Sequence, residues 1–162
     1  VMDWSGVLLT EVKNIDIALA GTGYAIFSVA MLIMRLLGDK TVQFLGEQKA
    51  VIGGSIVTAA GFALVVVLDN LYLNAFAFIL IGLGCANIVP VFYSLLKYQK
   101  DMPISAAVTS VTSLGYTGVI LGPALLGFVA HGINISAVFE LVALLLVIEA
   151  GIAKYVFCKL KM

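Results

Sequence analysis

The stretch RLLGDKTVQFLGEQK, from Arg35 to Lys49, places five charged side chains between two long apolar segments. The whole chain is 62% hydrophobic and only 11% charged, with a mean hydropathy of +1.15. Soluble domains have about 45–50% apolar and about 25% charged residues, because polar side chains must cover their surface. The composition therefore predicts an integral membrane protein, in which the charged stretch is a loop outside the lipid.

Five apolar segments are long enough to cross about 30 Å of hydrocarbon as helices, which takes about 20 residues each. They are Ile17–Leu37, Val51–Leu68, Leu71–Leu96, Ile104–Ala130 and Ile135–Phe157. The apolar runs are continuous, whereas the strands of a barrel alternate at every second residue. Val1–Thr10 is too short to cross alone, and we interpret it as the end of a sixth helix whose beginning is missing. We expect an all-α, polytopic membrane helical bundle over residues 1–162, with five full spans and one truncated span.

The basic residues fall on one side of the membrane in this topology. Only Lys13 lies on the other side, and the eight that share a side are Arg35, Lys40, Lys49, Lys97, Lys100, Lys154, Lys159 and Lys161. Loops on the cytoplasmic side carry an excess of Lys and Arg. The Arg35–Lys49 loop and the C-terminus are therefore predicted to be cytoplasmic.

The charged loop resembles a motif of the major facilitator superfamily, carried here by Arg35, Gly38, Asp39, Lys40, Gly46 and Lys49. In that family the motif joins the second and third helices of each six-helix half. With the truncated helix counted as the first, the loop occupies that place here, and the short basic tail indicates the C-terminal half. One departure concerns Gly46, which follows Asp39 after six residues where the family usually has two, so the details of the turn are not carried over.

Other residues agree with this resemblance. Gly118-x-x-x-Gly122-Pro123 is similar to a glycine-proline signature of some members. Asp3-Trp4-Ser5, with the groups Gly21-Thr22-Gly23-Tyr24 and Gly82-x-Gly84-x-Ala86-Asn87-x-x-Pro90, looks like the bacterial fucose-permease-like branch. The resemblance implies a multi-pass protein of the bacterial inner (plasma) membrane that transports a small solute by alternating access. It also implies secondary active transport, with proton coupling as an option, and an N-terminal half that this sequence lacks.

The loop motif has two interpretations. Asp39 can accept hydrogen bonds from the exposed N–H groups at the start of a neighbouring helix, with about 0.3–1 kcal/mol of charge–dipole energy. Gly38 would let the backbones approach, and Arg35, four residues before Asp39, could hold its carboxylate. The resemblance implies that such contacts latch the two halves together when the protein is open outward. The alternative is an ordinary solvated ion pair worth about 0.3–0.5 kcal/mol.

Several polar and aromatic residues recur at helical spacing within the spans. Because unpaired polar groups are costly in lipid, we expect these faces to point into the bundle or a watery cavity. The candidates for lining a substrate cavity are Trp4, Tyr24, Ser28, Asn87, Thr112 and Tyr116. The alternative for these residues is interhelical packing, at about 0.6 kcal/mol per hydrogen bond.

Glycine and proline in the spans predict packing and bending. Pro90 can loosen the third span, because proline lacks the N–H that a helix uses. Gly118 and Gly122 form a GxxxG pair that permits close helix contact, and Pro123 adds a mild kink. Glu149, near the middle of the last span, would cost about 2.5–3.5 kcal/mol if charged and unpaired. We expect it to be protonated or turned toward another helix.

Other function classes are less well supported. Neutral net charge gives no electrostatic case for nucleic acid. One histidine, two distant cysteines and, in the last span, two glutamates on opposite faces (Glu140 and Glu149) argue against an intramembrane enzyme, a metal site or a cofactor. A membrane-embedded assembly subunit without transport activity remains the alternative function. We predict a small-molecule substrate, the lipid bilayer and the missing N-terminal half as partners.

Overall fold

Helices form every regular element in residues 4–159, the part of the chain that this computed structural model describes. The short elements are α1 (Ser5–Val7), the π-helical turn η2 (Leu8–Val12), and the 3-10 turns η3 (Ile17–Leu19) and η4 (Leu96–Tyr98). The longer ones are α2 (Thr22–Leu36), α3 (Gly38–Leu45), α4 (Glu47–Val67), α5 (Leu71–Cys85), α6 (Ile88–Leu95), α7 (Ile104–Gly132) and α8 (Ile135–Lys159). The expected all-α fold is confirmed.

Five helical segments are long and apolar enough to cross a membrane. They are Ile17–Leu36, Glu47–Val67, Leu71–Tyr98, Ile104–Gly132 and Ile135–Lys159, so each predicted span is present with its ends shifted by a few residues. The predicted truncated helix appears as α1 and η2, and residues 1–3, with Asp3 of the resemblance, lie outside the described part. Large apolar side chains are exposed on the outer faces of the bundle, as lipid contact requires.

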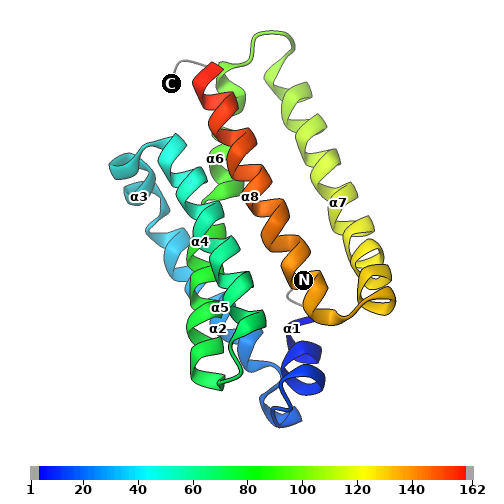
Figure 1. Cartoon of the computed structure of the whole chain (residues 1–162). Helices are drawn as coiled ribbons and strands as arrows, with labels where there is room; N and C mark the ends of the chain where they lie inside the picture. Colours follow the sequence, from blue (N-terminus) through cyan, green and yellow to red (C-terminus); the bar gives the residue numbers. More distant parts are fainter. Residues whose placement is uncertain (1–3, 160–162) are drawn as a thin grey trace.

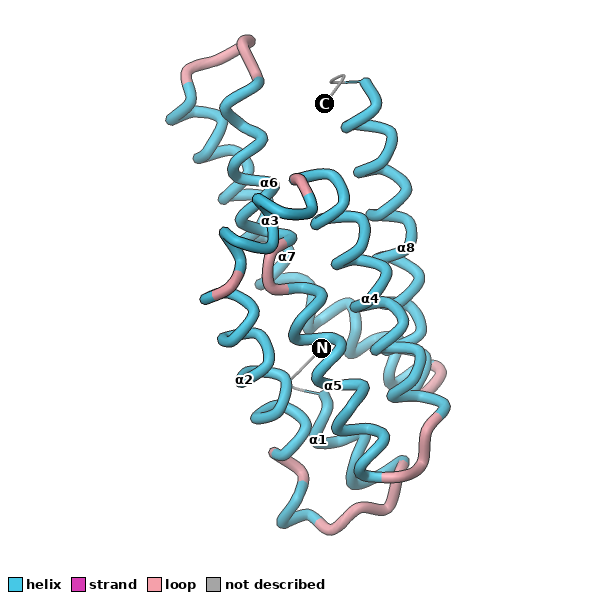
Figure 2. The backbone as a smooth tube through the Cα atoms, turned by 90° about the vertical axis from the view of Figure 1, so that its left-hand side faces the viewer, coloured by secondary structure: helices cyan, strands magenta, loops and turns pink. Residues whose placement is uncertain are grey.

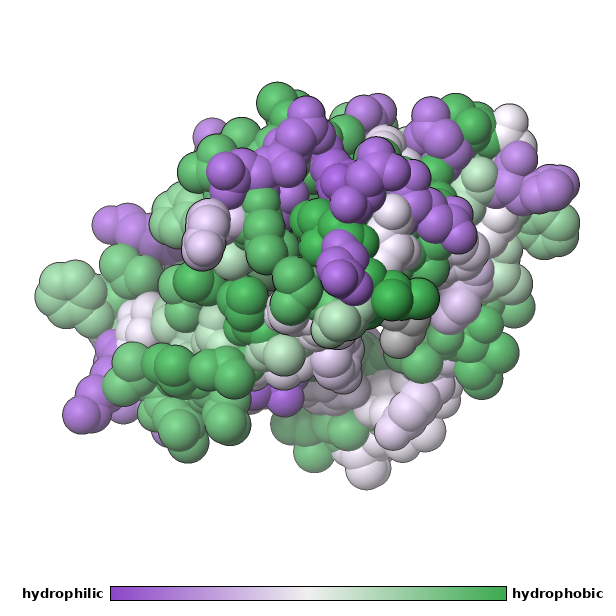
Figure 3. All heavy atoms as spheres, turned by 90° about the horizontal axis from the view of Figure 1, so that it is seen from below, coloured by the Kyte–Doolittle hydropathy of each residue, from purple (hydrophilic) through white to green (hydrophobic). Residues whose placement is uncertain are grey.

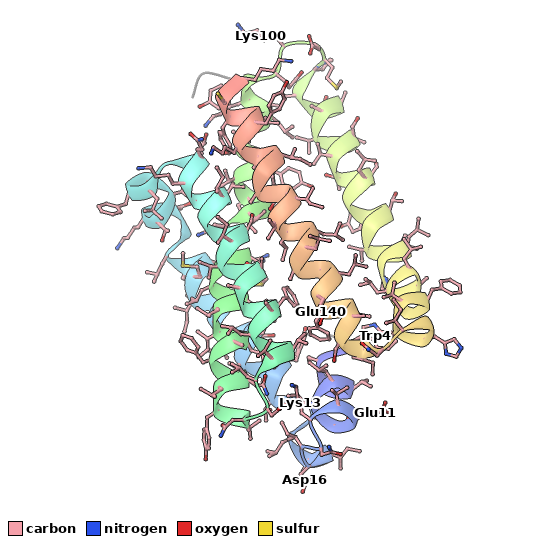
Figure 4. All side chains as sticks on the ribbon, viewed as in Figure 1. Trp4, Glu11, Lys13, Asp16, Lys100 and Glu140 are labelled. Atoms are coloured by element: carbon pink, nitrogen blue, oxygen red, sulfur yellow. The ribbon has the colours of Figure 1, made fainter. Side chains whose placement is uncertain are left out.

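The long helices run side by side, and their connections gather at two opposite ends (Figure 1). The short helix α3, the α6–α7 loop and the end of α8 lie toward one end in both ribbon views (Figure 2). The N-terminal turns and the α4–α5 connection lie at the other end, where hydrophilic side chains form a band beside apolar ones (Figure 3). Lys100 and Lys13 accordingly mark opposite ends of the molecule, as the charge pattern predicts (Figure 4).

Glycines allow α5 to pack closely between α2 and α4. A Cβ atom at Gly82 would lie 2.5 Å from the Phe27 carbonyl oxygen of α2. On the other side, a Cβ at Gly84 would lie 2.6 Å from the Gly54 carbonyl oxygen of α4. The neighbouring atoms are backbone and cannot swing away, so only glycine fits at these positions. The core beside this contact consists of Leu8, Leu9, Phe62, Val65, Ala77, Phe78, Ile81, Val138 and Phe139.

The third predicted span is a broken helix. The α-helical pattern stops at Cys85 and resumes at Ile88. Pro90 has no N–H to donate to the carbonyl of Ala86, so the regular hydrogen bond at this point is missing. The break places Asn87 at the N-cap of α6, without a capping side-chain bond.

Candidate functional site

The charged loop is built from two helix ends and a short helix. Arg35 lies in the last turn of α2 and Asp39 in the first turn of α3, so each charge complements the dipole of its own helix. Because Leu37 separates the two helices, Arg35 and Asp39 do not share one helical face. The predicted Arg35–Asp39 contact is wrong, since within residues 4–159 no ion pair or hydrogen bond joins these exposed side chains. Lys40 is exposed beside them.

The two glycines of the loop have different physical roles. Gly46 joins α3 to α4 with φ 82° and ψ 153°, a backbone conformation that is essentially restricted to glycine. Gly38 has an ordinary helical backbone conformation, but it is buried. A Cβ atom there would lie only 2.5 Å from Oδ1 of Asn87. Gly38 therefore lets the loop touch the break in the third span.

Asn87 lies where this contact meets a cavity. Asn87 is 6% exposed, and its side-chain amide forms no hydrogen bond within the described residues. The cavity, of about 260 Å³, is also lined by Thr41, Lys49, Met34 and Leu83. The structure thus brings Asn87 to the charged loop.

A second connection holds the start of α4 on the same end of the molecule. One carboxylate oxygen of Glu47 accepts hydrogen bonds from the Ser94 hydroxyl and the Lys97 ammonium, both at 2.9 Å. Glu47 stands in the first turn of α4, where the helix dipole also favours its negative charge. This cluster fixes the α6–η4 segment to the start of α4, within the charged loop.

Lys13 performs the corresponding role at the opposite end. Its ammonium donates to the Val66 carbonyl at 2.6 Å and to the Asp69 carboxylate at 2.7 Å. The Lys13 side chain is only 4% exposed, so its charge is neutralised at the end of α4. This single basic residue on the predicted outer side is therefore a structural tie between the N-terminal turns and α4.

The polar residues predicted on α2 remain near one another. The Ser28 hydroxyl donates to the Tyr24 carbonyl at 2.7 Å, which satisfies Ser28 within its own helix. The exposed Tyr24 ring lies against Phe27, with 6.3 Å between ring centroids. Tyr24 therefore lies half-exposed on the surface of the bundle.

The polar residues predicted on α7 form the second part of the site. Thr112 exchanges a hydrogen bond of 2.9 Å with the hydroxyl of Tyr93 on α6. Tyr116, one turn further, is 65% exposed. Tyr93 and Gly115 line a cleft of about 740 Å³ that also involves Gln99 and Val156. Tyr93 was missed by the sequence reasoning, although it sits six residues after Asn87 in the same span.

The remaining predicted residues are placed at the edges of this arrangement. Trp4 packs against the core cluster, and its ring lies 3.8 Å from the Cβ position of Gly127 on α7. Neither Gly118 nor Gly122 has a described atom within 4 Å of its Cβ position. Their close helix contact is not formed in this part of the chain and stays a prediction for a further helix. Pro123 stands inside α7, which is assigned as helix on both sides of it.

One intramembrane carboxylate also has a partner that the sequence did not indicate. Glu149 is turned toward α4, where the Ser55 hydroxyl bonds its Oε2 atom. The expectation that this residue faces another helix is confirmed. In residues 4–159, no group of three or more His, Cys, Asp or Glu side chains is placed to hold a metal ion.

Comparisons with known proteins found three transporter or membrane-protein relatives. An uncharacterized MFS-type transporter of Yersinia pestis is 39% identical over 96% of this chain and 41% of its own length. An uncharacterized transporter of Sinorhizobium fredii is 30% identical over 94% of this chain and 40% of its own length. The membrane protein MosC of Rhizobium meliloti is 25% identical over 94% of this chain and 36% of its own length.

The chain thus spans about two fifths of the length of the curated relatives that it matches. No family model matches the sequence. No solved structure matches it either. The similarity to a fucose-permease-like branch stays a prediction, since none of the relatives carries that name.

Proposed function

Because this multi-pass membrane chain belongs to the major facilitator superfamily of transporters, we propose that it forms the C-terminal half of a secondary transporter. The transporter moves a small solute by alternating access, as two helical halves rock around a central site. The missing N-terminal half and the lipid bilayer are its partners. The similarity to two named transporters over nearly the whole chain supports this function.

The observation that carries the proposal is the uncovered polar face of α7. Tyr116 is exposed, and Thr112 on the same face meets Tyr93 of α6. Hydroxyl groups on a membrane helix need a polar partner or water, because lipid offers neither. A solute cavity between this chain and a second half of the transporter would supply both the polar partner and the water. Since α7 has no Asp, Glu, Lys or Arg, we propose an uncharged, hydroxylated solute.

The charged loop supplies the conformational part of the proposal. Asp39 is exposed and has no recorded partner within the described residues. Its carboxylate is free to bind the N–H groups at the start of a helix in the other half. We propose that this contact latches the two halves in the outward-open state, with Arg35 and Lys40 beside it.

The same charge pattern orients the protein. The loop, the α6–α7 connection and the end of α8 carry the basic residues and share one end of the bundle (Figure 1). By the positive-inside rule, we propose that this end and the C-terminus face the cytoplasm of a cell whose inner membrane holds the protein. Lys13 at the opposite end is neutralised by Asp69.

Uptake by the full-length protein in proteoliposomes tests the function. We expect uptake of a solute from a panel of neutral sugars and polyols, and none of amino acids or dicarboxylates. Removing one hydroxyl with Tyr116→Phe should weaken apparent affinity by up to about tenfold, since a hydrogen bond contributes about 0.5–1.5 kcal/mol. Collapse of the proton gradient by a protonophore shows whether protons drive uptake.

Tyr155→Phe is the matched control, because Tyr155 is an equally exposed tyrosine on α8. Its uptake should equal that of the wild type. If no solute of the panel is transported in either gradient direction, and both variants behave alike, the assembly-subunit function is favoured instead.

A further inference from the structure

Glu149 and Ser55 form a polar pair that the proposed transport function does not use. Glu149 lies near the middle of α8 and Ser55 is fully buried in α4. The Ser55 hydroxyl is hydrogen-bonded to the Oε2 atom of Glu149. This bond crosses the α4–α8 contact, one of the most extensive helix contacts in the bundle.

The hydrogen atoms available at this pair determine the form of the carboxyl group. The Ser55 oxygen also lies 2.9 Å from the Val51 carbonyl oxygen. A serine hydroxyl carries one proton, so it cannot donate fully to both oxygens. If Glu149 carries a proton, its O–H donates to Ser55 and the Ser55 O–H donates to Val51. Every hydrogen atom then has one acceptor.

An ionised Glu149 would lack compensation at this position. Its Oε1 atom is buried and has no hydrogen-bond partner. Within the described residues, no Lys, Arg or His nitrogen lies within 4 Å of its carboxyl oxygens. The nearby α8 residues Ala150 and Ala153 are buried and apolar. A carboxylate with one shared donor and no cation is costly in such surroundings.

Other titratable groups on the surrounding helices are bonded elsewhere or exposed. Glu47 on α4 binds Lys97, Tyr93 on α6 binds Thr112, and Lys13 after η2 binds Asp69. The remaining groups on these elements are Lys49 on α4, Glu11 on η2, Tyr116 and His131 on α7, and Glu140, Lys154, Tyr155, Cys158 and Lys159 on α8, all of which are exposed. None of them forms a hydrogen bond or an ion pair with Glu149 within the described residues, so Ser55 is the polar side chain that meets this carboxyl group.

We propose that Glu149 is a proton-binding site at the α4–α8 interface and that its neutral acid group fastens α8 to α4 through Ser55. Loss of the proton places an unpaired negative charge between the two helices and loosens them. The inference requires a membrane-embedded bundle but does not depend on the solute or on the direction of transport.

Infrared spectroscopy of the full-length protein in lipid nanodiscs tests this site. At neutral pH we expect a carbonyl band of a protonated carboxylic acid that disappears in Glu149→Gln. The band should persist in Glu140→Gln, the matched control, because Glu140 lies exposed near the start of the same helix. In Ser55→Ala the band should move to higher wavenumber, since the acid loses its hydrogen-bond acceptor.

The proposal is overturned if Glu149→Gln removes the signal of an ionised carboxylate, or if Ser55→Ala leaves the acid band unmoved.

Discussion

The helices α5 and α7 are both long apolar elements with closely spaced glycines, yet they differ in how much of each is buried in the bundle. In an apolar 18-residue stretch of the α5–α6 span, 50% of the residues are buried in the bundle, whereas in the corresponding stretch of α7 none is buried. Gly84 on α5 touches the backbone of α4, while Gly118 on α7 faces open space. Gly82 and Gly84 of α5 therefore make close contacts inside this chain, whereas no described atom lies within 4 Å of the Cβ positions of Gly118 and Gly122 on α7.

The two helices differ in what compensates their glycines. A glycine in the middle of a helix costs about 0.5–1 kcal/mol relative to alanine, so it needs a compensating contact. At α5 the compensation is close helix packing. At α7 the same composition, combined with an exposed polar face, fits a helix that borders a second half and a solute cavity.

The largest expected effect comes from filling the α5 contact. Gly84→Leu forces a side chain against the α4 backbone and should destabilise the full-length protein by more than about 3 kcal/mol, at or beyond the upper end for overpacked cores. In a separately expressed C-terminal half, Gly118→Leu should be neutral or stabilising by up to about 1 kcal/mol, because leucine favours helix over glycine and meets no described atom there. Detergent unfolding of both variants measures this, and equal losses would contradict the distinction between the two helices.

An intermediate effect is expected where the loop meets the broken span. Gly38→Ala places a Cβ atom 2.5 Å from Oδ1 of Asn87, and because this side chain can turn away we expect a loss of about 1 kcal/mol in unfolding free energy. Gly53→Ala, in α4, is the matched control, because no atom lies within 4 Å of its Cβ position. It should be neutral or slightly stabilising, since alanine favours helix.

Replacement of Asn87 sharpens the same test. If the amide oxygen is the obstacle, Asn87→Ala should restore most of the stability lost in Gly38→Ala. Failure of the double variant to recover would mean that the loop does not rest on the break in the third span.

The smallest expected effect concerns the link between α7 and the rest of the bundle. Tyr93→Phe removes the hydrogen bond to Thr112 and should cost about 0.6 kcal/mol, the average for such bonds between membrane helices. Amide hydrogen exchange should rise in α7 and stay unchanged in α5. Tyr72→Phe, which alters an exposed tyrosine of α5, should change neither helix.

Much of this fold could be predicted from composition, because span length and continuous apolarity depend on local sequence. The motif in the sequence also included Gly38, expected to let backbones approach, and Gly46, whose turn was not predicted; the structure gives each a distinct role. The predicted contact between Arg35 and Asp39 is not formed, because the prediction assumed that a spacing of four residues places them on one face of a continuous helix. The chain leaves the α2 helix at Leu37, so that spacing no longer places the two charges on one face.

The interhelical pairs could not be predicted, since they join residues that are distant in the sequence. Ser55 and Glu149 are 94 residues apart, and Lys13 and Asp69 are 56 apart. Their meeting depends on which helices are neighbours and on how each is rotated. A single sequence gives the apolar face of a helix but no signal for its partner.

The claim that α7 borders an aqueous cavity is tested most directly by thiol labelling of the full-length protein in membranes. Cysteine is introduced at Tyr116, which is 65% exposed, or at Leu114, which is 74% exposed, after Cys85 and Cys158 are replaced. The two positions are about 200° apart around the helix, so they face opposite directions. We predict that a water-soluble reagent modifies the cysteine at 116 and leaves the one at 114 unmodified. Equal labelling of the two positions, or none at 116, would contradict the proposal that this face of α7 lines a solute path.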